Sequence, residues 1–323
     1  MKKLFVWGLF LLLVAGPGCG PSRFNSTMLF ARASVGGTGK LQCFFINTLN
    51  GDSTLLRLPD GKAVLIDGGY KGEGRHILKC LQALGISELE AVILTHSDAD
   101  HYRGLTRIFK RIPVRHFYYS GVGSWPKHYR EFIKAVDASG CDADIIREGD
   151  PLPLSPNLDC QVLWPPVTAH SMELSPHLSN TYSIVLRISY DSFSLLFVGD
   201  IKDDSEKTLR TKYGPALKAD ILKVAHHGSG SSSDRKFLET VDPRFAVIMG
   251  EWYNIDFEVQ HKPSPRVIKR LKDVCERLIR THPEGAFFVE TDGSAITRMF
   301  TAKDLLNAPP LSPAASPSPG VTP

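Results

Sequence analysis

Two imidazoles and two carboxylates stand within six residues of one another, in the side chains of His96, Asp98, Asp100 and His101. Carboxylates a few ångströms apart repel each other and raise each other's pKa, so this cluster is unfavourable unless positive charge lies between its members. A pair of metal ions would supply that charge. Nitrogen and oxygen ligands without thiolates suit zinc, manganese or iron. The alternative interpretation is a solvated acidic loop that merely contains histidine.

The segments on either side of the cluster predict where it lies. The apolar run 91–94 before it predicts a buried strand. The apolar residues after it recur at helical spacing; they are Leu105, Ile108, Phe109 and Ile112. The cluster therefore falls on a turn between a strand and a helix, where successive side chains can point at two different ions. Because both flanks are apolar and tightly bounded, we favour the metal site over the solvated loop.

A further carboxylate follows a strand in the second half of the chain. Asp200 comes directly after the apolar run 194–198 and Gly199. Open α/β sheets present their sites at the carboxyl ends of strands. Asp200 is therefore a candidate ligand, while the acids after it, at 203–206, are typical of the first turn of a helix.

Two adjacent histidines end the next predicted strand, 221–225. In extended backbone, successive side chains point to opposite faces, so one of His226 and His227 can bind metal while the other faces the substrate. The alternative is a histidine satisfied in the core. The Gly/Ser run that follows offers backbone N–H groups and hydroxyls suited to an anion, which makes Ser229 and Ser232 candidate substrate-binding residues. A Gly/Ser linker has the same composition.

The stretch 95–101 resembles the signature of the metallo-β-lactamase superfamily, in the variant where Asp98 replaces the middle histidine. This variant is typical of the hydrolase domain of ComEC competence proteins and of bacterial phosphorylcholine esterases. The resemblance covers roughly residues 40–300. It implies an α/β fold (α+β in some schemes), a four-layer αββα sandwich with two similar halves and a dinuclear metal site at the strand ends between them.

The resemblance also implies a role for each candidate residue. His96 and Asp98 would hold one ion, Asp100, His101 and His227 would hold the other, and Asp200 would bridge them. Asp67, which ends the predicted strand 63–66, would orient ligands from behind; a simple Asp-Gly turn is an equal alternative. His226 would stabilise developing charge or protonate the leaving oxygen.

Two departures from the family pattern limit this transfer. The usual histidine of the third motif is absent, and Asn180 stands in its region as a candidate catalytic residue. One ion would then have three protein ligands and an open position.

The family's His-Pro is here His261-Lys262-Pro263, just before a helix carrying Val267, Leu271, Val274 and Leu278. A helix start suits phosphate, so His261 is a candidate substrate-binding residue, although the extra lysine leaves its aim open.

The activity implied is hydrolysis of a phosphodiester by a hydroxide that bridges two divalent metal ions, with zinc preferred and manganese as the alternative. The substrate stays open between nucleic acid, in particular a single strand, and a small phosphodiester. Two competing functions remain: a lactamase or lactonase, and a non-catalytic binding lipoprotein that retained the fold. No protein partner is inferred.

The first residues have the pattern of an export signal. A charged start, Met1-Lys2-Lys3, precedes an apolar run, 4–15, that is too short to span a bilayer. Gly18-Cys19 resembles a lipoprotein cleavage site, although Gly16 stands where that pattern prefers leucine. We expect a lipoprotein of the cell envelope that meets the membrane only through a lipid on Cys19. Ordinary cleavage, giving a periplasmic or extracellular protein, and an uncleaved anchor are the alternatives.

Composition bounds the rest of the chain. Its 323 residues, 42% of them apolar, suffice for a sizeable core. The net charge of +4 falls to +2 without Lys2 and Lys3, which gives little support to a nucleic-acid partner but leaves a local basic patch open. Besides Cys19 there remain five cysteines, an odd number, so no disulfide framework is predicted.

We expect four segments: a signal peptide at 1–18, a tether at 19–39, one hydrolase domain at 40–302, and a disordered Pro/Ser-rich tail at 303–323. Within the domain, hairpins open the first half and helices alternate with strands after it. The last two predicted strands, 286–290 and 294–300, are expected to close the second sheet.

We predict that the exported protein begins at Cys19 and carries lipid there, because a short apolar run ends at a small residue followed by cysteine. Intact-mass measurement on membrane-extracted protein tests this, with Cys19→Ala as the control that should lose the lipid mass. A cytosolic species that retains Met1 would refute export. Cleavage elsewhere without lipid would refute only the anchor.

Overall fold

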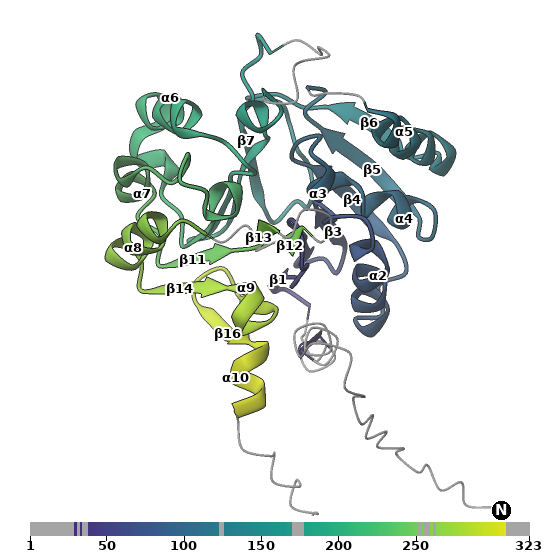
Figure 1. The fold of residues 1–323 in the computed structure, drawn as a ribbon. Helices are drawn as coiled ribbons and strands as arrows, with labels where there is room; N and C mark the ends of the chain where they lie inside the picture. Colours follow the sequence, from purple (N-terminus) through teal and green to yellow (C-terminus); the bar gives the residue numbers. More distant parts are fainter. Residues whose placement is uncertain are drawn as a thin grey trace, which may run out of the picture.

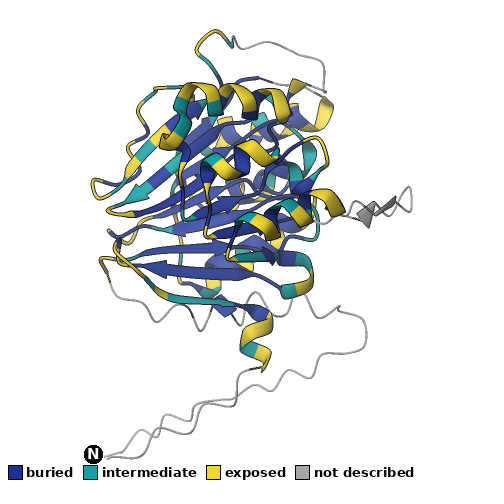
Figure 2. Ribbon diagram, turned by 90° about the vertical axis from the view of Figure 1, so that its left-hand side faces the viewer, coloured by how far each residue is buried: buried dark blue, intermediate teal, exposed yellow. Residues whose placement is uncertain are grey.

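Two β-sheets packed face to face form the centre of the protein, and helices cover their outer faces (Figure 1). This computed structural model describes residues 29–30, 33, 38–122, 126–169, 178–250, 253–254, 259–260 and 263–307. The predicted α/β class and four-layer αββα arrangement are confirmed. In Figure 2 the central strands are mostly buried, while exposed residues lie along the outer sides of the helices. The edge strand Asp142–Ile145 is exposed along its whole length.

The first sheet has eight strands in the order β16-β15-β1-β2-β3-β4-β5-β6. Their bounds are β1 Leu41–Phe45, β2 Thr54–Arg57, β3 Ala63–Ile66, β4 Leu89–Leu94, β5 Val114–Tyr119, β6 Asp142–Ile145, β15 Phe287–Thr291 and β16 Ile296–Thr301. The helices of this half are α2 Glu73–Ala83, α3 Ala99–Tyr102, α4 Leu105–Phe109, α5 Lys127–Ser139, α9 Thr281–Glu284 and α10 Ala302–Asn307.

The second sheet has six strands in the order β14-β11-β10-β9-β8-β7. Their bounds are β7 Asp159–Trp164, β8 Val185–Tyr190, β9 Phe193–Phe197, β10 Ile221–Lys223, β11 Phe245–Ile248 and β14 Arg277–Arg280. Its helices are α6 Asp203–Tyr213, α7 Arg235–Val241 and α8 Pro265–Val274, with 3-10 turns η2 Asn180–Tyr182, η3 Gly214–Leu217 and η4 Ala225–Gly228. A small hairpin joins β12 Tyr253–Asn254 and β13 Val259–Gln260.

Parallel pairing brings the ends of separate strands to one edge of each sheet. β3 pairs in parallel with β4, so the residues after them, Asp67 and His96, lie side by side. β9 pairs in parallel with β10, which places Asp200 beside the His226-His227 turn. Side chains from the two edges meet, since His96 Nε2 after β4 lies 3.9 Å from Asp200 Oδ2 after β9. A site built from both halves follows directly from this topology.

Three apolar layers hold the sandwich together. One lies between the first sheet and its helices, one between the sheets, and one beneath α6, α7 and α8. Side chains alternate between layers along each strand: Phe44 packs in the first layer, whereas its neighbours Cys43 and Phe45 pack between the sheets. Because both faces of the central strands are buried, these strands read in the sequence as continuous apolar runs.

The last hairpin does not close the second sheet, and that prediction is wrong. β15 pairs antiparallel with β1, from Leu41 opposite Thr291 to Phe45 opposite Phe287, and β16 extends the first sheet further. Local alternation predicts a strand but does not identify its neighbour. The helix predicted before it also ends early, because Leu278 belongs to β14.

Both ends of the predicted domain extend further than expected. Leu29, Phe30 and Ala33, assigned to the tether, are fully buried in the first apolar layer, where the Phe30 ring lies 5.1 Å from that of Phe44. α10 extends helical structure to Asn307, into the segment predicted as a disordered tail. Residues 1–28, with Cys19, and 308–323 lie outside the described residues. Among the described helices, none has the length and apolarity needed to cross a membrane.

Candidate metal centre

The turn after β4 and the short helix α3 carry the first part of the site. His96 comes from the turn and His101 from α3; both are buried, and their ring centroids are 4.1 Å apart. Gly68 lies against this turn, and its N–H donates to the His101 carbonyl at 2.8 Å. A side chain at position 68 would collide with Leu105, so glycine is needed for the two loops to approach.

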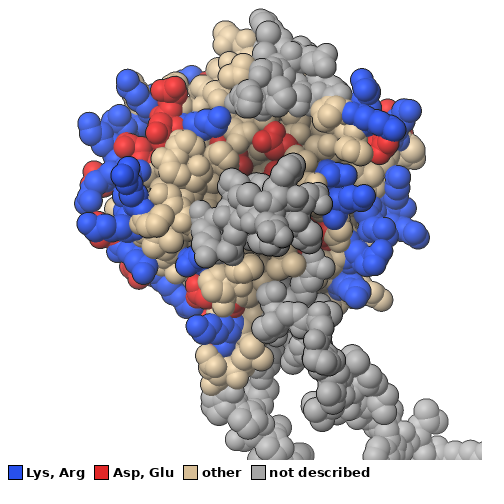
Figure 3. All heavy atoms as spheres, in the orientation of Figure 1, with Lys and Arg blue, Asp and Glu red and all other residues tan. Residues whose placement is uncertain are grey.

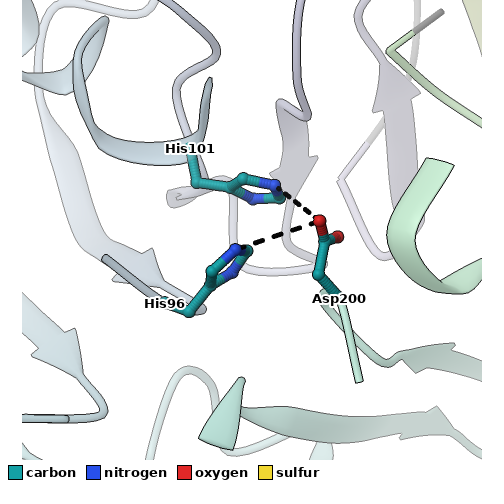
Figure 4. Close-up of side chains that lie close together, drawn as sticks. All are labelled: His96, His101 and Asp200. Carbon is teal, nitrogen blue, oxygen red and sulfur yellow. Dashed lines mark ion pairs between the residues drawn. The ribbon is translucent and has the colours of Figure 1, made fainter. Parts of the chain in front are cut away.

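Three imidazole nitrogens converge on one oxygen of Asp200. The Nε2 atoms of His96, His101 and His227 lie 3.9, 3.5 and 3.3 Å from Asp200 Oδ2. All three nitrogens are buried without a hydrogen-bond partner. Figure 4 shows the rings of His96 and His101 directed at this carboxylate from the opposite sheet. Buried polar atoms that lack partners call for a ligand, and these are atoms that bind metal.

Asp100 and Asp98 complete the set of candidate ligands, on the side of the centre nearer to solvent. Asp100 Oδ2 lies 3.2 Å from His227 Nε2. Asp98 Oδ2 lies 3.7 Å from His96 Nε2, and its other oxygen accepts a hydrogen bond from the Ser179 hydroxyl. The Asp98 side chain is 35% exposed, whereas that of Asp200 is 3% exposed. Asp98 therefore lies at the rim of the site and Asp200 at its floor.

Asp67 fixes the orientation of His101 from behind. One of its oxygens accepts from the Thr95 N–H at 2.8 Å, and the other lies 2.8 Å from both the Thr95 hydroxyl and His101 Nδ1. Because Nδ1 is held by Asp67, Nε2 of the same ring is turned towards Asp200. Asp67 thus contacts both the turn after β4 and the helix α3, besides standing at the end of β3.

The two adjacent histidines adopt a conformation that the sequence did not predict. β10 ends at Lys223, and His226 and His227 both have left-handed backbone, with φ of 48° and 52°. The expectation of extended backbone is therefore wrong, although the rings still diverge. His227 Nδ1 lies 3.1 Å from the Met249 carbonyl, which turns Nε2 to the centre. His226 Nε2 lies 3.4 Å from the amide nitrogen of Asn180.

Sequence reasoning missed a buried ion pair beneath the centre. Lys223 Nζ lies 3.0 Å from the Gly199 carbonyl and 3.5 Å from Asp200 Oδ1, and it forms an ion pair with Asp52. Asp52 Oδ1 also lies 3.3 Å from His227 Nδ1. A lysine inside the apolar run 221–225 was a usable signal, because charged residues are almost never buried unpaired. Asp52 had only the appearance of a hairpin residue.

The pKa values of the buried histidines and carboxylates in the centre depend on one another. Burial opposes the charged forms of His101 and His227, but the Asp200 carboxylate and its acidic neighbours outweigh burial and hold the pKa of both well above the usual value. Burial likewise opposes charge on Asp52, yet Lys223 and His227 lower its pKa to about 2. The carboxylates thus demand compensating positive charge.

The donor set fits divalent cations. Four groups among the described residues have ligand atoms within 4.8 Å of one another. Two of them consist of predicted ligands alone: His96, His101 and Asp200, and Asp100, His101 and His227. His96 is suited to donate a lone pair, because burial and the neighbouring His101 lower its pKa and keep it neutral. The nitrogen and carboxylate donors match the chemistry predicted from the sequence.

The predicted anion site in the Gly/Ser run is not supported. Ser232 is fully buried and its hydroxyl donates to the Ile201 carbonyl at 2.7 Å, so it does not face a substrate. The N–H groups of Ser229 and Ser233 donate to the His226 carbonyl and to Glu206. Of the two candidates, Ser229 and Ser232, only the half-buried Ser229 is accessible to a substrate. His261 lies outside the described residues.

Similarity to known sequences covers the region that holds the site. The sequence model described as the metallo-beta-lactamase superfamily matches residues 46–250. ComE operon protein 3 of Bacillus subtilis is 29% identical over 292 residues, 85% of this chain and 35% of that protein. Competence protein ComA of Neisseria gonorrhoeae is 27% identical over 240 residues, 73% of this chain and 30% of that protein. Recombination protein 2 of Haemophilus influenzae is 30% identical over 213 residues, 62% of this chain and 23% of that protein.

The chain thus spans between 23% and 35% of the length of these three relatives. Similar solved structures include YhfI of Bacillus subtilis, with 13% identity, a TM-score of 0.47, and coverage of 78% of this chain and 100% of that one. Another is Igni18, a metallo hydrolase of Ignicoccus hospitalis, with 14% identity, a TM-score of 0.48, and coverage of 77% of this chain and 98% of that one.

We predict that the protein binds two divalent ions per chain after reconstitution with zinc. Asp200→Ala should lower the content to below one ion, because all three free imidazole nitrogens face this carboxylate, whereas His96→Ala should lose about one ion. Elemental analysis of the dialysed proteins measures both. The exposed Asp204→Ala on α6 is the matched control and should retain two ions. Wild-type stoichiometry clearly below one would contradict the site.

Proposed function

Because the chain belongs to the metallo-beta-lactamase superfamily, which confirms the resemblance read from the motif, we propose that it hydrolyses phosphodiesters with two divalent metal ions. The observation that carries this proposal is the convergence of three unpartnered imidazole nitrogens on Asp200 Oδ2, with two more carboxylates beside them. A non-catalytic binding module would have no need to keep all these ligand atoms directed at one buried point.

His96, Asp98, Asp100, His101, Asp200 and His227 are the residues that would hold the ions. When bound, the ions would supply a nucleophilic water of lowered pKa and neutralise charge on the phosphoryl oxygens. Zinc is preferred because three of the donors are imidazoles, and manganese is the alternative because the other three are carboxylates. The protein's own part is to keep His101 and His227 aimed, through Asp67 and the Met249 carbonyl.

His226 and Asn180 are placed to act on the substrate. Nδ1 of His226 is buried without a hydrogen-bond partner, while Nε2 lies beside the Asn180 amide. Burial lowers the pKa of His226, so its ring is neutral near pH 7. A neutral imidazole offers an N–H hydrogen bond to developing negative charge more readily than it releases a proton to the leaving oxygen. Of the two roles considered for His226, this favours charge stabilisation.

The phosphodiester is favoured over a lactam or lactone on two grounds. Asp98 replaces the middle histidine of the motif, the variant that is typical of phosphodiester chemistry in the families it resembles. The names of the relatives, competence and recombination proteins, favour a nucleic-acid substrate. A small phosphodiester remains the second candidate. We further propose that the enzyme acts outside the cytoplasm, a proposal that rests on residues 1–19 alone.

We predict that zinc-loaded protein hydrolyses a generic aryl phosphodiester and that a chelator abolishes the activity. Asp200→Ala should lower turnover by roughly 10³-fold or more, since losing a single well-placed electrostatic contact already costs about 10²- to 10³-fold. Release of the chromogenic phenol measures the rate, and Asp204→Ala serves as the control. Hydrolysis of a β-lactam or lactone without hydrolysis of the phosphodiester would overturn the substrate class.

We predict that replacing the two neighbouring histidines has different effects on metal binding and turnover. His227→Ala removes a donor and should weaken metal binding by about 10-fold or more. His226→Ala should keep the metal content and lower turnover by roughly 10²- to 10⁴-fold. Metal content and turnover are measured together, with His116→Ala on β5 as the control. If His226→Ala strips the metal and His227→Ala spares it, the roles are reversed; full activity in both would remove the pair from the mechanism.

A further inference from the structure

Two buried charged residues beneath the metal centre, Lys223 and Asp52, have no part in the proposed reaction. Their side chains are 3% and 5% exposed and form an ion pair with each other. Figure 3 shows many lysine and arginine side chains at the surface of the protein, where water solvates their charge. A buried ion pair is often no more stable than an apolar pair of similar size. The stability of the fold alone therefore does not account for this one.

Each member of the pair contacts one candidate metal ligand. Lys223 Nζ lies 3.5 Å from Asp200 Oδ1 and donates to the Gly199 carbonyl at 3.0 Å. Asp52 Oδ1 lies 3.3 Å from His227 Nδ1. Since His227 Nε2 in turn lies 3.3 Å from Asp200 Oδ2, the four side chains form a closed ring. Two ligands of the centre thus share one ion pair behind them.

Asp52 stands behind His227 as Asp67 stands behind His101. The Asp67 carboxylate lies 2.8 Å from His101 Nδ1, the ring nitrogen remote from the centre. Asp52 has the corresponding place at Nδ1 of His227, which also lies 3.1 Å from the Met249 carbonyl. A carboxylate at this nitrogen fixes the orientation of the ring and presents the other nitrogen to a metal ion.

Tightly packed backbone holds both members of the pair. Lys223 is the last residue of β10, which pairs with β9 on one side and with β11 on the other. Asp52 lies in the loop between β1 and β2, and its carbonyl accepts from the Gly69 N–H at 2.8 Å. A Cβ on the neighbouring Gly51 would lie 1.7 Å from the Asp100 carbonyl oxygen, so this loop packs directly on a loop of ligands. The ion pair therefore joins a central strand of the second sheet to a closely packed loop of the first.

We propose that Lys223 and Asp52 are positioning residues of the metal centre. Lys223 holds the Asp200 carboxylate so that Oδ2 faces the imidazoles, and Asp52 holds the His227 ring so that Nε2 faces the same point. Because the two residues hold each other, removing one releases the other, and the pair acts as one unit. The inference rests on the metal centre of the proposed function and goes beyond it, since neither residue is among the six that would hold the ions.

A positioning pair and a pair of mere counter-charges predict opposite results for one substitution. Lys223→Met removes a positive charge near the ions, so the change in charge alone should tighten zinc binding. Loss of positioning should weaken zinc binding, by about the 10- to 100-fold that is typical of residues orienting metal ligands. Asp52→Asn should weaken it in either case. The lysine variant therefore decides between the two explanations.

The double variant Asp52→Asn/Lys223→Met keeps the net charge of the wild type. If the two residues acted only through charge, their effects would cancel and zinc affinity would return to the wild-type value. Because residues that hold each other act as one unit, we expect the double variant to lose about as much affinity as either single variant. Removing both members of a buried pair is also milder for folding than leaving one charge alone.

Competition with a zinc-binding chromophore measures the zinc affinity of the full chain and its variants, and circular dichroism checks their fold. The visible spectrum of the cobalt-loaded proteins is a second readout, because it depends on the arrangement of the ligands, and it should change in all three variants. The matched controls make the same substitutions in the exposed ion pair of Lys218 and Asp242. Lys218→Met, Asp242→Asn and the two together should keep the wild-type affinity and spectrum.

Three results would overturn the positioning role. The first is zinc affinity that rises or stays unchanged in Lys223→Met. The second is wild-type affinity in the double variant, which also decides the question if Lys223→Met does not fold. The third is an equal loss of affinity in the Lys218 and Asp242 controls, which would show a general effect of removing ion pairs.

The inference and the proposed function fail separately. If the wild type binds zinc and the variants bind it weakly, but no phosphodiester is hydrolysed, the hydrolase is wrong and the positioning pair stands. If the phosphodiester is hydrolysed and zinc affinity does not fall in Lys223→Met, the positioning pair is wrong and the hydrolase stands.

Discussion

The Asp200 carboxylate is the point on which the site depends. It is buried at the end of β9, with Oδ2 facing three imidazoles and Oδ1 facing Lys223. A buried charge is severely unfavourable unless it is paired on all sides. Lys223, itself paired with Asp52, satisfies the inner oxygen with an internal cation. The outer oxygen, Oδ2, faces three imidazole nitrogens that have no hydrogen-bond partner. The outer side of the carboxylate is therefore the side suited to a metal ion.

Holding this arrangement requires unusual backbone. Asp67, His226 and His227 are in the left-handed region, with φ of 57°, 48° and 52°, although none of them is glycine. Such residues persist only where surrounding contacts overdetermine them. Here the contacts are the hydrogen bonds of Asp67 to Thr95 and His101, and the packing of the turn against β11. The two parallel strand edges bring the strained turns together, so the topology supports geometry that no single segment would adopt.

The sequence predicted what is local and missed what depends on neighbours in space. The 96–101 cluster and its flanking strand carry their chemistry within a few residues, so these donors could be predicted from the residues themselves. The αββα fold was predicted from the family resemblance of the same motif. Lys223 and Asp52 meet only through the packing of β10 against the loop after β1, and no local pattern joins them. The prediction for the last hairpin was wrong for the same reason, because no local pattern identifies β1 as the neighbour of β15. The left-handed backbone of His226 could not be predicted, because the apolar run 221–225 continues to the histidines whereas β10 ends at Lys223.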